Sequence, residues 1–429
     1  MTQDTLAIDF GTSHSLVGAV VDGKPHEAIP IDPLSPDPTL MRTLLYFPDG
    51  ENCFYGAEAI KAYIEQDMEG RLFRSFKSHL PNQNYLGTMV GKRVLSLENL
   101  VGTFLLELKK RSEKHFQRTF DSAILGRPAR YSMDEVAEGF ALHRMKKAAE
   151  FAGFKQVRFV PEPLAAALEY RKEIHEPKIL LIGDFGGGTS DFTVLRVSPG
   201  SFRSKDVLSV EGCPLAGDAL DSVFMSERLN QSFGAKSLYK LPLSENILEM
   251  PKPIMERLNK PAHIVHLKEP ETYNFIKQVQ KCSLRPQDAS QIQRLFTLIE
   301  DNQIFSFFEE IERTKKTLSD KETAKFKFDY PDLETEDVFS RQEFEMWSAK
   351  VKADVFAAMD RALVTAGIID DQVDVVFLTG GTAYVPFIRR VFTDRFGSDR
   401  VKDKKFFHSV LSGLVEYGLE SGRSGLELE

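Results

Sequence analysis

The sequence predicts an α/β protein with two cores, and three observations support this prediction. The chain has 429 residues, which is more than one ordinary core accommodates. A short pattern of an acid, an aromatic residue, glycine and hydroxyl residues occurs twice, first at residues 9–13 and again at residues 184–190. Signals for strands, helices and glycine turns alternate in both halves of the chain. Each half is therefore expected to form an α/β core of its own.

The composition excludes several classes of function. Hydrophobic residues make up 42% and charged residues 28% of the chain, as in soluble globular proteins. The net charge is −8 and the lysines and arginines form no basic block, which argues against nucleic acid as a partner. No apolar run reaches the ~18 residues of a membrane span, and the first residues show no signal-peptide pattern. Three widely spaced cysteines fit neither a disulfide framework nor a zinc site, so we expect a cytoplasmic protein without a membrane partner.

The clearest signal for a site is the stretch ILLIGDFGGGTSDFTVLRV at residues 179–197. Its apolar ends predict two strands, and the glycines between them let a backbone approach a ligand and present N–H groups to an anion. Asp184 and Asp191 would repel a bare anion, but they suit Mg²⁺ held between them and a phosphate chain, because Mg²⁺ favours hard oxygen ligands. The stretch therefore predicts a hairpin that binds Mg²⁺ and phosphate. A tight hairpin whose glycines serve geometry alone is the alternative.

The same pattern occurs earlier, in LAIDFGTSHSLVGAVVDG at residues 6–23. Asp9 corresponds to Asp184, and the two acids are 184 − 9 = 175 residues apart. Two related lobes, each with a hairpin that faces phosphate, would enclose a nucleotide between them. Chance similarity of two hairpins is the alternative.

In the first half, helix and strand signals follow one another from residue 132 onward. Ser132–Glu135 has the pattern of a capping box, and the helix that it starts should end before Gly153. Residues 157–160 (VRFV) predict a short buried strand. After Pro161-Glu162-Pro163, the sequence LAAALEY predicts another helix, because proline suits the first turn.

The second half shows the same alternation. Ser340–Glu343 is another capping box, and its helix should end near Gly367. The strand VDVVFL at residues 373–378 and the turn TGGTAYVP at residues 379–386 come next.

Six stretches, in this order and at this approximate spacing, resemble the ATPase domain of the seventy-kilodalton heat-shock chaperones. They are IDFGTSHS, RSFKSHL, RFVPEPLAAALEY, GDFGGGTSDFTVL, IERTKKTLS and FLTGGTAYVP. The resemblance extends from about residue 6 to about residue 417, and within the family the chain is most similar to the shorter, YegD-type members. It implies the actin-like ATPase fold, in which two lobes with ribonuclease-H-like cores hold ATP or ADP between them. The expected lobes are residues 1–176, with core segments 1–33 and 98–176 and an inserted subdomain at 34–97, and residues 177–429, with core segments 177–225 and 335–420 and a mostly helical inserted subdomain at 226–334.

The resemblance assigns phosphate and metal contacts to the two hairpins. Asp9, Asp184 and Asp191 match the acids around Mg²⁺ and its waters, and three carboxylates on two loops suit a hydrated Mg²⁺. The residues that match the two phosphate loops are Gly11, Thr12, Ser13, His14, Gly186, Gly187, Gly188 and Thr189. His14 stands where an aromatic residue is usual, and an ordinary strand histidine is the alternative for it.

The resemblance also implies catalytic roles for Asp9, Asp184 and Thr189, and for two residues outside the hairpins. Lys77 matches the lysine that reaches the γ-phosphate and offsets its charge; taken alone, it would be a solvated surface lysine. Glu162 matches the glutamate that positions the attacking water; a carboxylate that interacts with a helix dipole is the alternative, and both can hold.

The adenosine contacts are expected from the second half of the chain. Glu312, Lys315, Lys316 and Ser319 have the spacing of one helix face, for which a solvated charged face is the alternative. The other residues that match nucleoside contacts are Gly217, Asp218, Gly380, Gly381, Thr382 and Tyr384. Tyr384 replaces an arginine that commonly stacks on adenine, and Pro161 replaces the asparagine usual before Glu162.

The resemblance implies a Mg²⁺-dependent ATPase with slow turnover, a molecular chaperone or chaperone-like protein that acts with an unidentified protein partner or client. No motif of the peptide-binding domain or of its apolar linker follows the ATPase motifs, so we expect no peptide-binding domain in this chain. The alternatives are a nucleotide-dependent interaction switch with little hydrolysis, a small-molecule kinase of the same fold, and an actin-like polymer.

Overall fold

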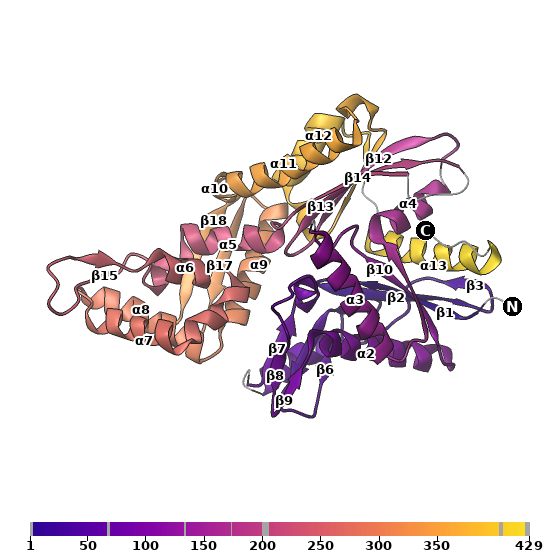
Figure 1. The fold of residues 1–429 in the computed structure, drawn as a ribbon. Helices are drawn as coiled ribbons and strands as arrows, with labels where there is room; N and C mark the ends of the chain where they lie inside the picture. The colour runs from indigo at the N-terminus through magenta and orange to yellow at the C-terminus, as the bar shows by residue number, and fades with distance from the viewer. Residues whose placement is uncertain are drawn as a thin grey trace. The chain divides into compact units, whose positions relative to one another are not determined.

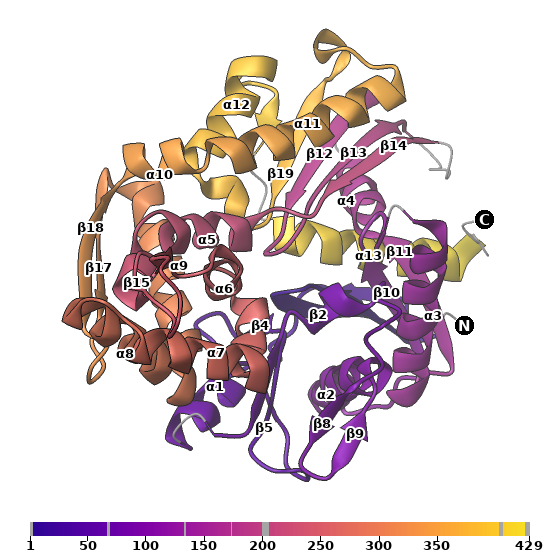
Figure 2. The same cartoon turned by 60° about the vertical axis from the view of Figure 1, so that its left-hand side comes forward.

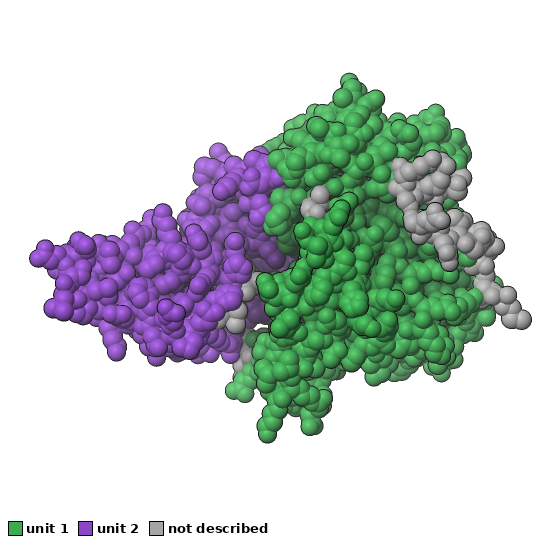
Figure 3. Space-filling view, viewed as in Figure 1, with its two compact units in different colours: residues 1–214, 356–383, 390–429 green, residues 215–355, 384–389 purple. Residues whose placement is uncertain are grey.

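The computed structural model describes residues 3–66, 69–132, 134–172, 174–199, 206–402 and 406–424. The chain forms two compact units, coloured separately in Figure 3. Unit 1 comprises residues 1–214, 356–383 and 390–429, and unit 2 comprises residues 215–355 and 384–389. Among the described residues, no helix combines the length and apolar character needed to cross a membrane.

Unit 1 contains two mixed sheets with the same order of strands. The first sheet has the order β11-β10-β1-β2-β3, with the short β4 (Met41–Arg42) also paired to β2. Its strands are β1 (Thr5–Phe10), β2 (His14–Val21), β3 (Lys24–His26), β10 (Ser122–Arg127) and β11 (Gln156–Pro161). The second has the order β14-β13-β12-β19-β20, formed by β12 (Lys178–Phe185), β13 (Ser190–Val197), β14 (Val207–Cys213), β19 (Val375–Thr379) and β20 (Val401–Lys402).

In both sheets the two hairpin strands and the strand that follows them, β3 or β14, pair antiparallel, and the other two strands add in parallel. The two predicted hairpins, β1–β2 and β12–β13, have matching registers. Phe10 pairs with Ser15 in one and Phe185 with Ser190 in the other, so that each pair closes a four-residue connection. The internal repeat in the sequence therefore corresponds to a repeated sheet topology.

Helices α4 (Glu162–Arg171) and α13 (Phe406–Ser424) lie between the two sheets (Figures 1 and 2). Their apolar side chains and those of both sheets form one buried cluster, here called the inner cluster. A Cβ atom added at Gly413 of α13 would lie 1.8 Å from the Ala165 carbonyl oxygen, so the two helices cross at backbone contact. The outer face of the first sheet packs against α2 (Leu97–Phe116) and α3 (Glu135–Phe151).

Between β4 and α2, unit 1 contains a smaller, strand-rich segment. Its elements are β5 (Leu44–Phe47), β6 (Phe54–Tyr55), α1 (Gly56–Glu65), β7 (Arg71–Arg74), the 3-10 helix η1 (Phe76–His79), β8 (Thr88–Val90) and β9 (Arg93–Leu95). At the outer face of the second sheet, Phe392 of α12 (Pro386–Phe396) packs against Phe185 and Phe192.

Unit 2 is mostly helical and has a core rich in phenylalanine, in which Phe224 and Phe307 each contact other aromatic rings. Its helices are α5 (Gly217–Glu227), η3 (Leu229–Phe233), α6 (Lys252–Leu258), η4 (Pro261–Lys268), α7 (Pro270–Lys281), α8 (Pro286–Glu300), α9 (Ile304–Asp320) and α10 (Arg341–Trp347). Its strands are β15 (Leu238–Tyr239), β16 (Leu248–Glu249), β17 (Thr323–Phe328) and β18 (Thr335–Ser340). The predicted lobe and subdomain boundaries stay predictions.

The structure corrects two local predictions. Asp134, and not Ser132, caps α3, because its side chain accepts the N–H of Ala137. The capping box at Ser340 is confirmed, but the helix that it starts ends at Trp347, and α11 (Ala349–Ala366) begins after the buried Ser348. A propensity pattern alone does not locate such a break, because tertiary context overrides propensity.

Candidate functional site

Four carboxylates converge in unit 1 where the hairpins meet α4. Asp9, Asp184 and Asp191 each lie an even number of residues from members of the inner cluster, so their side chains point to the inner faces of the sheets. Asp184 and Asp191 are paired directly opposite each other. Glu162 is the first residue of α4, the helix that these inner faces enclose. The alternation of the strands thus directs three acids toward the start of this helix.

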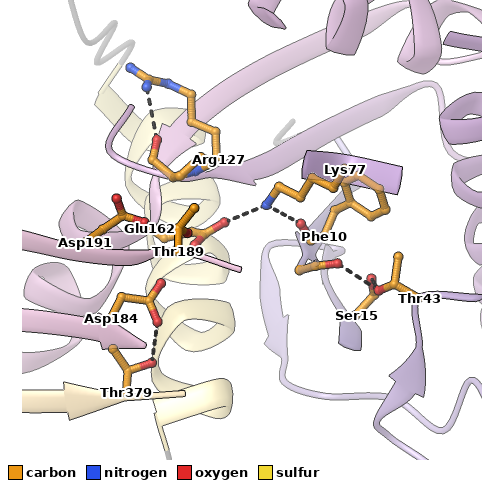
Figure 4. A network of polar contacts seen from close by, with 12 residues as sticks. Phe10, Ser15, Thr43, Lys77, Arg127, Glu162, Asp184, Thr189, Asp191 and Thr379 are labelled. Carbon is orange, nitrogen blue, oxygen red and sulfur yellow. Dashed lines mark hydrogen bonds and ion pairs between the residues drawn. The ribbon is translucent and has the colours of Figure 1, made fainter. Parts of the chain in front are cut away.

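Lys77 brings a positive charge to these acids. Its Nζ atom lies 3.1 Å from Oε1 of Glu162 and donates a hydrogen bond to the carbonyl oxygen of Phe10, at the end of β1 (Figure 4). The lysine is only 6% exposed, so the alternative of a solvated surface lysine is wrong. The structure brings Lys77 and Glu162 together, as the resemblance implies, while their roles in catalysis stay predictions.

Burial and repulsion raise the pKa values of the three aspartates. Burial, helped by Glu162, raises the pKa of Asp184 to about 7. Burial, helped by the charge of Asp184, raises the pKa of Asp191 to about 7, and burial together with Glu162 holds the pKa of Asp9 well above its usual value. Burial opposes the charge of Lys77, but Glu162, Tyr131 and Asp9 together outweigh it, and the pKa of this lysine is raised. The site therefore favours a further cation.

The donor set fits a hydrated Mg²⁺ better than a directly coordinated metal. In the described ranges no three His, Cys, Asp or Glu side chains are grouped closely enough to hold a metal ion by themselves. Mg²⁺ usually keeps several of its waters and takes only one or two carboxylates directly. The raised pKa values of Asp184 and Asp191 show a demand for positive charge that such an ion would meet. The metal contacts predicted for these residues and Asp9 stay predictions.

Replacing Asp184 with asparagine is expected to stabilise the free protein, and more so at high pH. The folded protein holds a proton on this acid up to pH about 7, whereas the unfolded chain loses it near pH ~4. Stability therefore falls as the pH rises between these values, and the full penalty is present above them. The melting temperature of the Asp184→Asn variant should exceed that of the wild type by more at pH ~8 than at pH ~5, without nucleotide or divalent ions.

Asp49 provides a control of opposite sign for this experiment. Hydrogen bonds from the backbone N–H groups of Asn52 and Glu51 lower its pKa. The stability that it contributes is present above the pKa of the unfolded chain and is lost as the pH falls through the folded pKa. Asp49→Asn should therefore lower the melting temperature, mainly at the higher pH. If Asp184→Asn also lowers the melting temperature, mainly at the higher pH, the raised pKa of Asp184 is contradicted.

The second glycine loop is closed by its own backbone. The N–H of Gly186 donates to the carbonyl of Thr189 over 2.9 Å, and the Thr189 hydroxyl donates to Asp191 over 3.1 Å. A Cβ atom at Gly188 would meet no atom within 4 Å, so this glycine borders open space. Gly187 lies in the same loop. The loop therefore has room for a ligand beside its backbone.

The first loop, formed by Gly11, Thr12 and Ser13, is held by a threonine that the sequence analysis did not identify. Thr43 donates its hydroxyl to the carbonyl of Gly11 and its N–H to the carbonyl of Ser13, each over 2.8 Å. Gly11 has no room for a side chain, because a Cβ atom would lie 2.3 Å from the carbonyl oxygen of His14. His14 is the first residue of β2. In the second sheet, Thr379 donates to Asp184 over 3.3 Å (Figure 4).

Arg144 of α3 is another residue that the sequence analysis missed. Its guanidinium is buried, lies 2.9 Å from Glu98 and donates to the carbonyls of Leu80, Asn82 and Tyr85 over 3.2, 2.9 and 2.6 Å. These carbonyls belong to the chain just after η1, the short helix that carries Lys77. Because the planar guanidinium can serve several acceptors at once, Arg144 fixes the segment that brings Lys77 to the site.

The residues predicted to contact adenosine from α9 differ in their surroundings. Lys315 is buried, lies 2.7 Å from Asp221 and donates to the carbonyl of Gly217 over 3.3 Å. Lys316 is exposed and forms a 2.7 Å ion pair with Glu312, so the alternative of a solvated charged face describes this pair but not Lys315. Burial raises the pKa of Asp221 to about 6, although Lys315 opposes the shift.

The remaining predicted nucleoside contacts belong to several elements. Ser319 lies on α9 and Asp218 in the first turn of α5, in unit 2. Gly380, Gly381 and Thr382 follow β19 in unit 1, where the Thr382 hydroxyl donates to the Gly186 carbonyl over 3.4 Å. Tyr384 belongs to unit 2 and is 61% exposed. The joint role of these residues in binding adenosine stays a prediction.

Comparisons of the sequence with known proteins find one family and several relatives. The family described as Hsp70 protein matches residues 54–260 and 296–405. A chaperone protein HscA homolog of Rickettsia akari (strain Hartford) is 28% identical over 264 residues, which cover 60% of this chain and 41% of that protein. Proteins of the same name from Rickettsia felis and Rickettsia rickettsii (strain Sheila Smith) are 26% and 27% identical over similar lengths. The chain thus matches about two fifths of the length of these relatives.

The predicted fold class is confirmed: the chain has the α/β, actin-like ATPase fold. The family match covers well over half of the chain and includes Lys77, Glu162 and the second glycine hairpin. The two sheets of like topology and the two glycine hairpins agree with it. The chain therefore belongs to the Hsp70 family.

Proposed function

We propose that this protein is a Mg²⁺-dependent ATPase that works as a chaperone or chaperone-like protein in the cytoplasm. The observation that carries the proposal is the pair of Lys77 and Glu162, which lies among the buried Asp9 and the partly buried Asp184 and Asp191 beside two glycine hairpins. A buried site whose acids have strongly raised pKa values is typical of a functional centre rather than of a structural ion pair. The family match adds support.

The backbone of the two glycine loops would bind the phosphates. N–H groups in glycine-rich turns form concave sites for anions, and open space beside Gly188 allows an approach. When bound, Mg²⁺ would neutralise charge on the phosphate oxygens, and Asp9, Asp184 and Asp191 are the residues that would hold it. The Thr189 hydroxyl, bonded to Asp191, would fix the position of that carboxylate.

Lys77 and Glu162 would act on the reacting group. In the structure the ammonium group of Lys77 is bonded to Glu162 and to the carbonyl of Phe10. A γ-phosphoryl group in reach of Lys77 would compete for this ammonium and leave Glu162 an oxygen with which to orient a water. Positioning of the water in line, together with charge stabilisation by Lys77, would then provide most of the catalysis.

The structure around Pro161 supports hydrolysis over a switch without turnover. Pro161 is the last residue of β11 and pairs with Arg127, and Glu162 begins α4 directly after it. Glu162 still reaches Lys77, so the proline leaves this catalytic pair formed. A nucleotide-dependent interaction switch with little hydrolysis is therefore the second candidate.

Single-turnover hydrolysis of labelled ATP with Mg²⁺ tests the proposal. The wild type should release phosphate slowly, and Asp184→Asn should do so about 100-fold more slowly, because it loses a charge that holds the metal. Tight ATP binding without phosphate release by either protein would favour the switch. ATP consumption that requires an added sugar or acid would instead indicate a kinase.

Chaperone action would require a second protein. Nucleotide-driven closure of the lobes would be the signal, and a client or partner protein would read it. The proteins named as HscA homologs, which are chaperones by that name, support this part of the proposal.

A further inference from the structure

The loop between β10 and α3 carries a tyrosine that the proposed mechanism does not use. The ring of Tyr131 packs against the buried cluster on the outer face of the first sheet. Its hydroxyl oxygen is buried, and among the residues that the structure describes it has no hydrogen-bond partner. Since most buried polar groups have a partner, this hydroxyl is open to a hydrogen bond with a group from outside the chain.

The backbone of this loop is fixed, so the ring cannot easily move to find a partner. The N–H groups of Tyr131 and Ser132 both donate to Oε2 of Glu138, over 2.6 and 3.1 Å. Arg127 donates to the carbonyls of Pro128 and Ala129 over 3.1 and 2.9 Å. Arg127 and Glu138 also form an ion pair of 3.5 Å, which closes the loop.

The charged groups with the strongest effect on this hydroxyl are the two proposed catalytic residues. Burial raises the pKa of Tyr131 to about 12; Lys77 lowers this value and Glu162 raises it, each more strongly than Arg127 or Glu138 does. The effect is mutual, because Tyr131 also contributes to the raised pKa of Lys77. At neutral pH the hydroxyl therefore keeps its proton and can donate it in a hydrogen bond.

We infer that the Tyr131 hydroxyl donates a hydrogen bond to an oxygen of the γ-phosphoryl group of bound ATP. It would be a catalytic residue beside Lys77 and Glu162, and the inference rests on the proposed function. A neutral donor suits this place, because a further negatively charged group would be costly to bury beside the carboxylates, whereas a hydroxyl adds no charge. A γ-phosphoryl oxygen offers a strong acceptor, and a hydrogen bond to it strengthens as charge develops during transfer.

The attacking water is the other acceptor within reach of this region. Glu162 is the residue proposed to orient that water, and a carboxylate accepts its hydrogen bonds without a second donor. The ring packs against the cluster that contains Phe10, whose carbonyl binds Lys77, and Phe76, which precedes Lys77, the proposed phosphoryl contact. The phosphoryl oxygen is therefore the favoured acceptor.

The Tyr131→Phe variant tests the inference, because it removes the hydroxyl and keeps the ring. We expect the melting temperature to stay equal or to rise, since an unpartnered polar atom is lost. ATP affinity should fall about 10-fold while ADP affinity stays unchanged, and single-turnover hydrolysis should fall about 10- to 100-fold. Affinities are measured by calorimetry with Mg²⁺ and either nucleotide.

Tyr46→Phe is the matched control. The Tyr46 hydroxyl donates to the carbonyl of Glu69 over 2.7 Å, away from the site, so its loss should lower the melting temperature and leave hydrolysis unchanged. If Tyr131→Phe binds ATP and ADP as the wild type does, the inference is overturned; if hydrolysis alone falls, the hydroxyl contacts the water instead, which also overturns it. A wild type that binds neither nucleotide would overturn the proposed function itself, and this inference with it.

Discussion

The Lys77→Ala variant is expected to lose ATP hydrolysis by about 100- to 1000-fold while its affinity for ADP stays within a few-fold of the wild type. The ammonium group is buried among acids, where its charge acts through a medium of low polarity and is worth more than on the surface. ADP lacks the γ-phosphoryl group that this charge would stabilise. The loss should therefore appear in the chemical step, measured under single-turnover conditions, and not in ADP binding.

The same substitution should also destabilise the protein, for a separate reason. Without Lys77, Glu162 loses its partner and stays buried beside Asp9 and Asp184, two acids whose pKa values are already raised by burial and by Glu162. Breaking a buried ion pair at one end typically costs about 3–5 kcal/mol of unfolding free energy. The double variant Lys77→Ala/Glu162→Gln should recover much of this stability, because the uncompensated charge is gone, and it should remain inactive.

Lys155→Ala is the matched control for both readouts. Lys155 forms a 2.7 Å ion pair with Asp121, and both side chains are exposed, so the substitution should change neither hydrolysis nor stability noticeably. Full hydrolysis by Lys77→Ala would remove the role assigned to this lysine. A double variant that regains turnover together with stability would show that the single variant had merely been unfolding.

The hairpins and their acids could be predicted from the sequence because their signal is local. The strands, the glycine turn and the acids next to it lie within about 20 consecutive residues, and the period of two determines which face each acid occupies. The repeat at Asp9 and Asp184 predicted two related α/β cores, and the two sheets of like topology agree with it. The burial of Lys77 needed the resemblance, because a lone lysine in a short segment has no local signal.

Residues that act by holding the backbone could not be predicted in this way. Thr43 and Arg144 bind carbonyl groups that are 32 and about 60 residues away in the sequence. Carbonyl groups occur at every residue and leave no mark in the sequence, so no pattern shows which of them a side chain will meet. Tyr131 could not be predicted either, because no sequence pattern shows that its buried hydroxyl has no hydrogen-bond partner. The helix face of Lys315 and Lys316 was predicted, but the burial of Lys315 depends on Asp221, in another helix.

Gly380→Ala is expected to lower the free energy of unfolding by about 3 kcal/mol or more, although it adds one methyl group. Gly380 has a φ of +83°, in the left-handed region that favours glycine, and an added Cβ atom would lie 1.9 Å from the carbonyl oxygen of Phe185. Phe185 ends β12, directly before the glycine loop, and β12 pairs with β19 up to Asp184 and Thr379. The substitution would push these strands apart at the site, so nucleotide binding should be lost together with stability.

Gly381→Ala tests whether a glycine in this turn is needed for nucleotide binding, apart from any need for it in folding. A Cβ atom there would meet no atom within 4 Å, so Gly381→Ala should leave the free energy of unfolding, measured with urea, within about 0.5 kcal/mol of the wild type. If the backbone of this turn approaches the nucleoside, as the resemblance implies, the new methyl group should weaken ATP and ADP equally, since both carry the same nucleoside. Equal tolerance of alanine at both positions would contradict the close approach of residues 380 and 185. Unchanged affinity in Gly381→Ala, with stability retained, would mean that the second glycine of this pair serves the turn alone and that the nucleoside is held elsewhere.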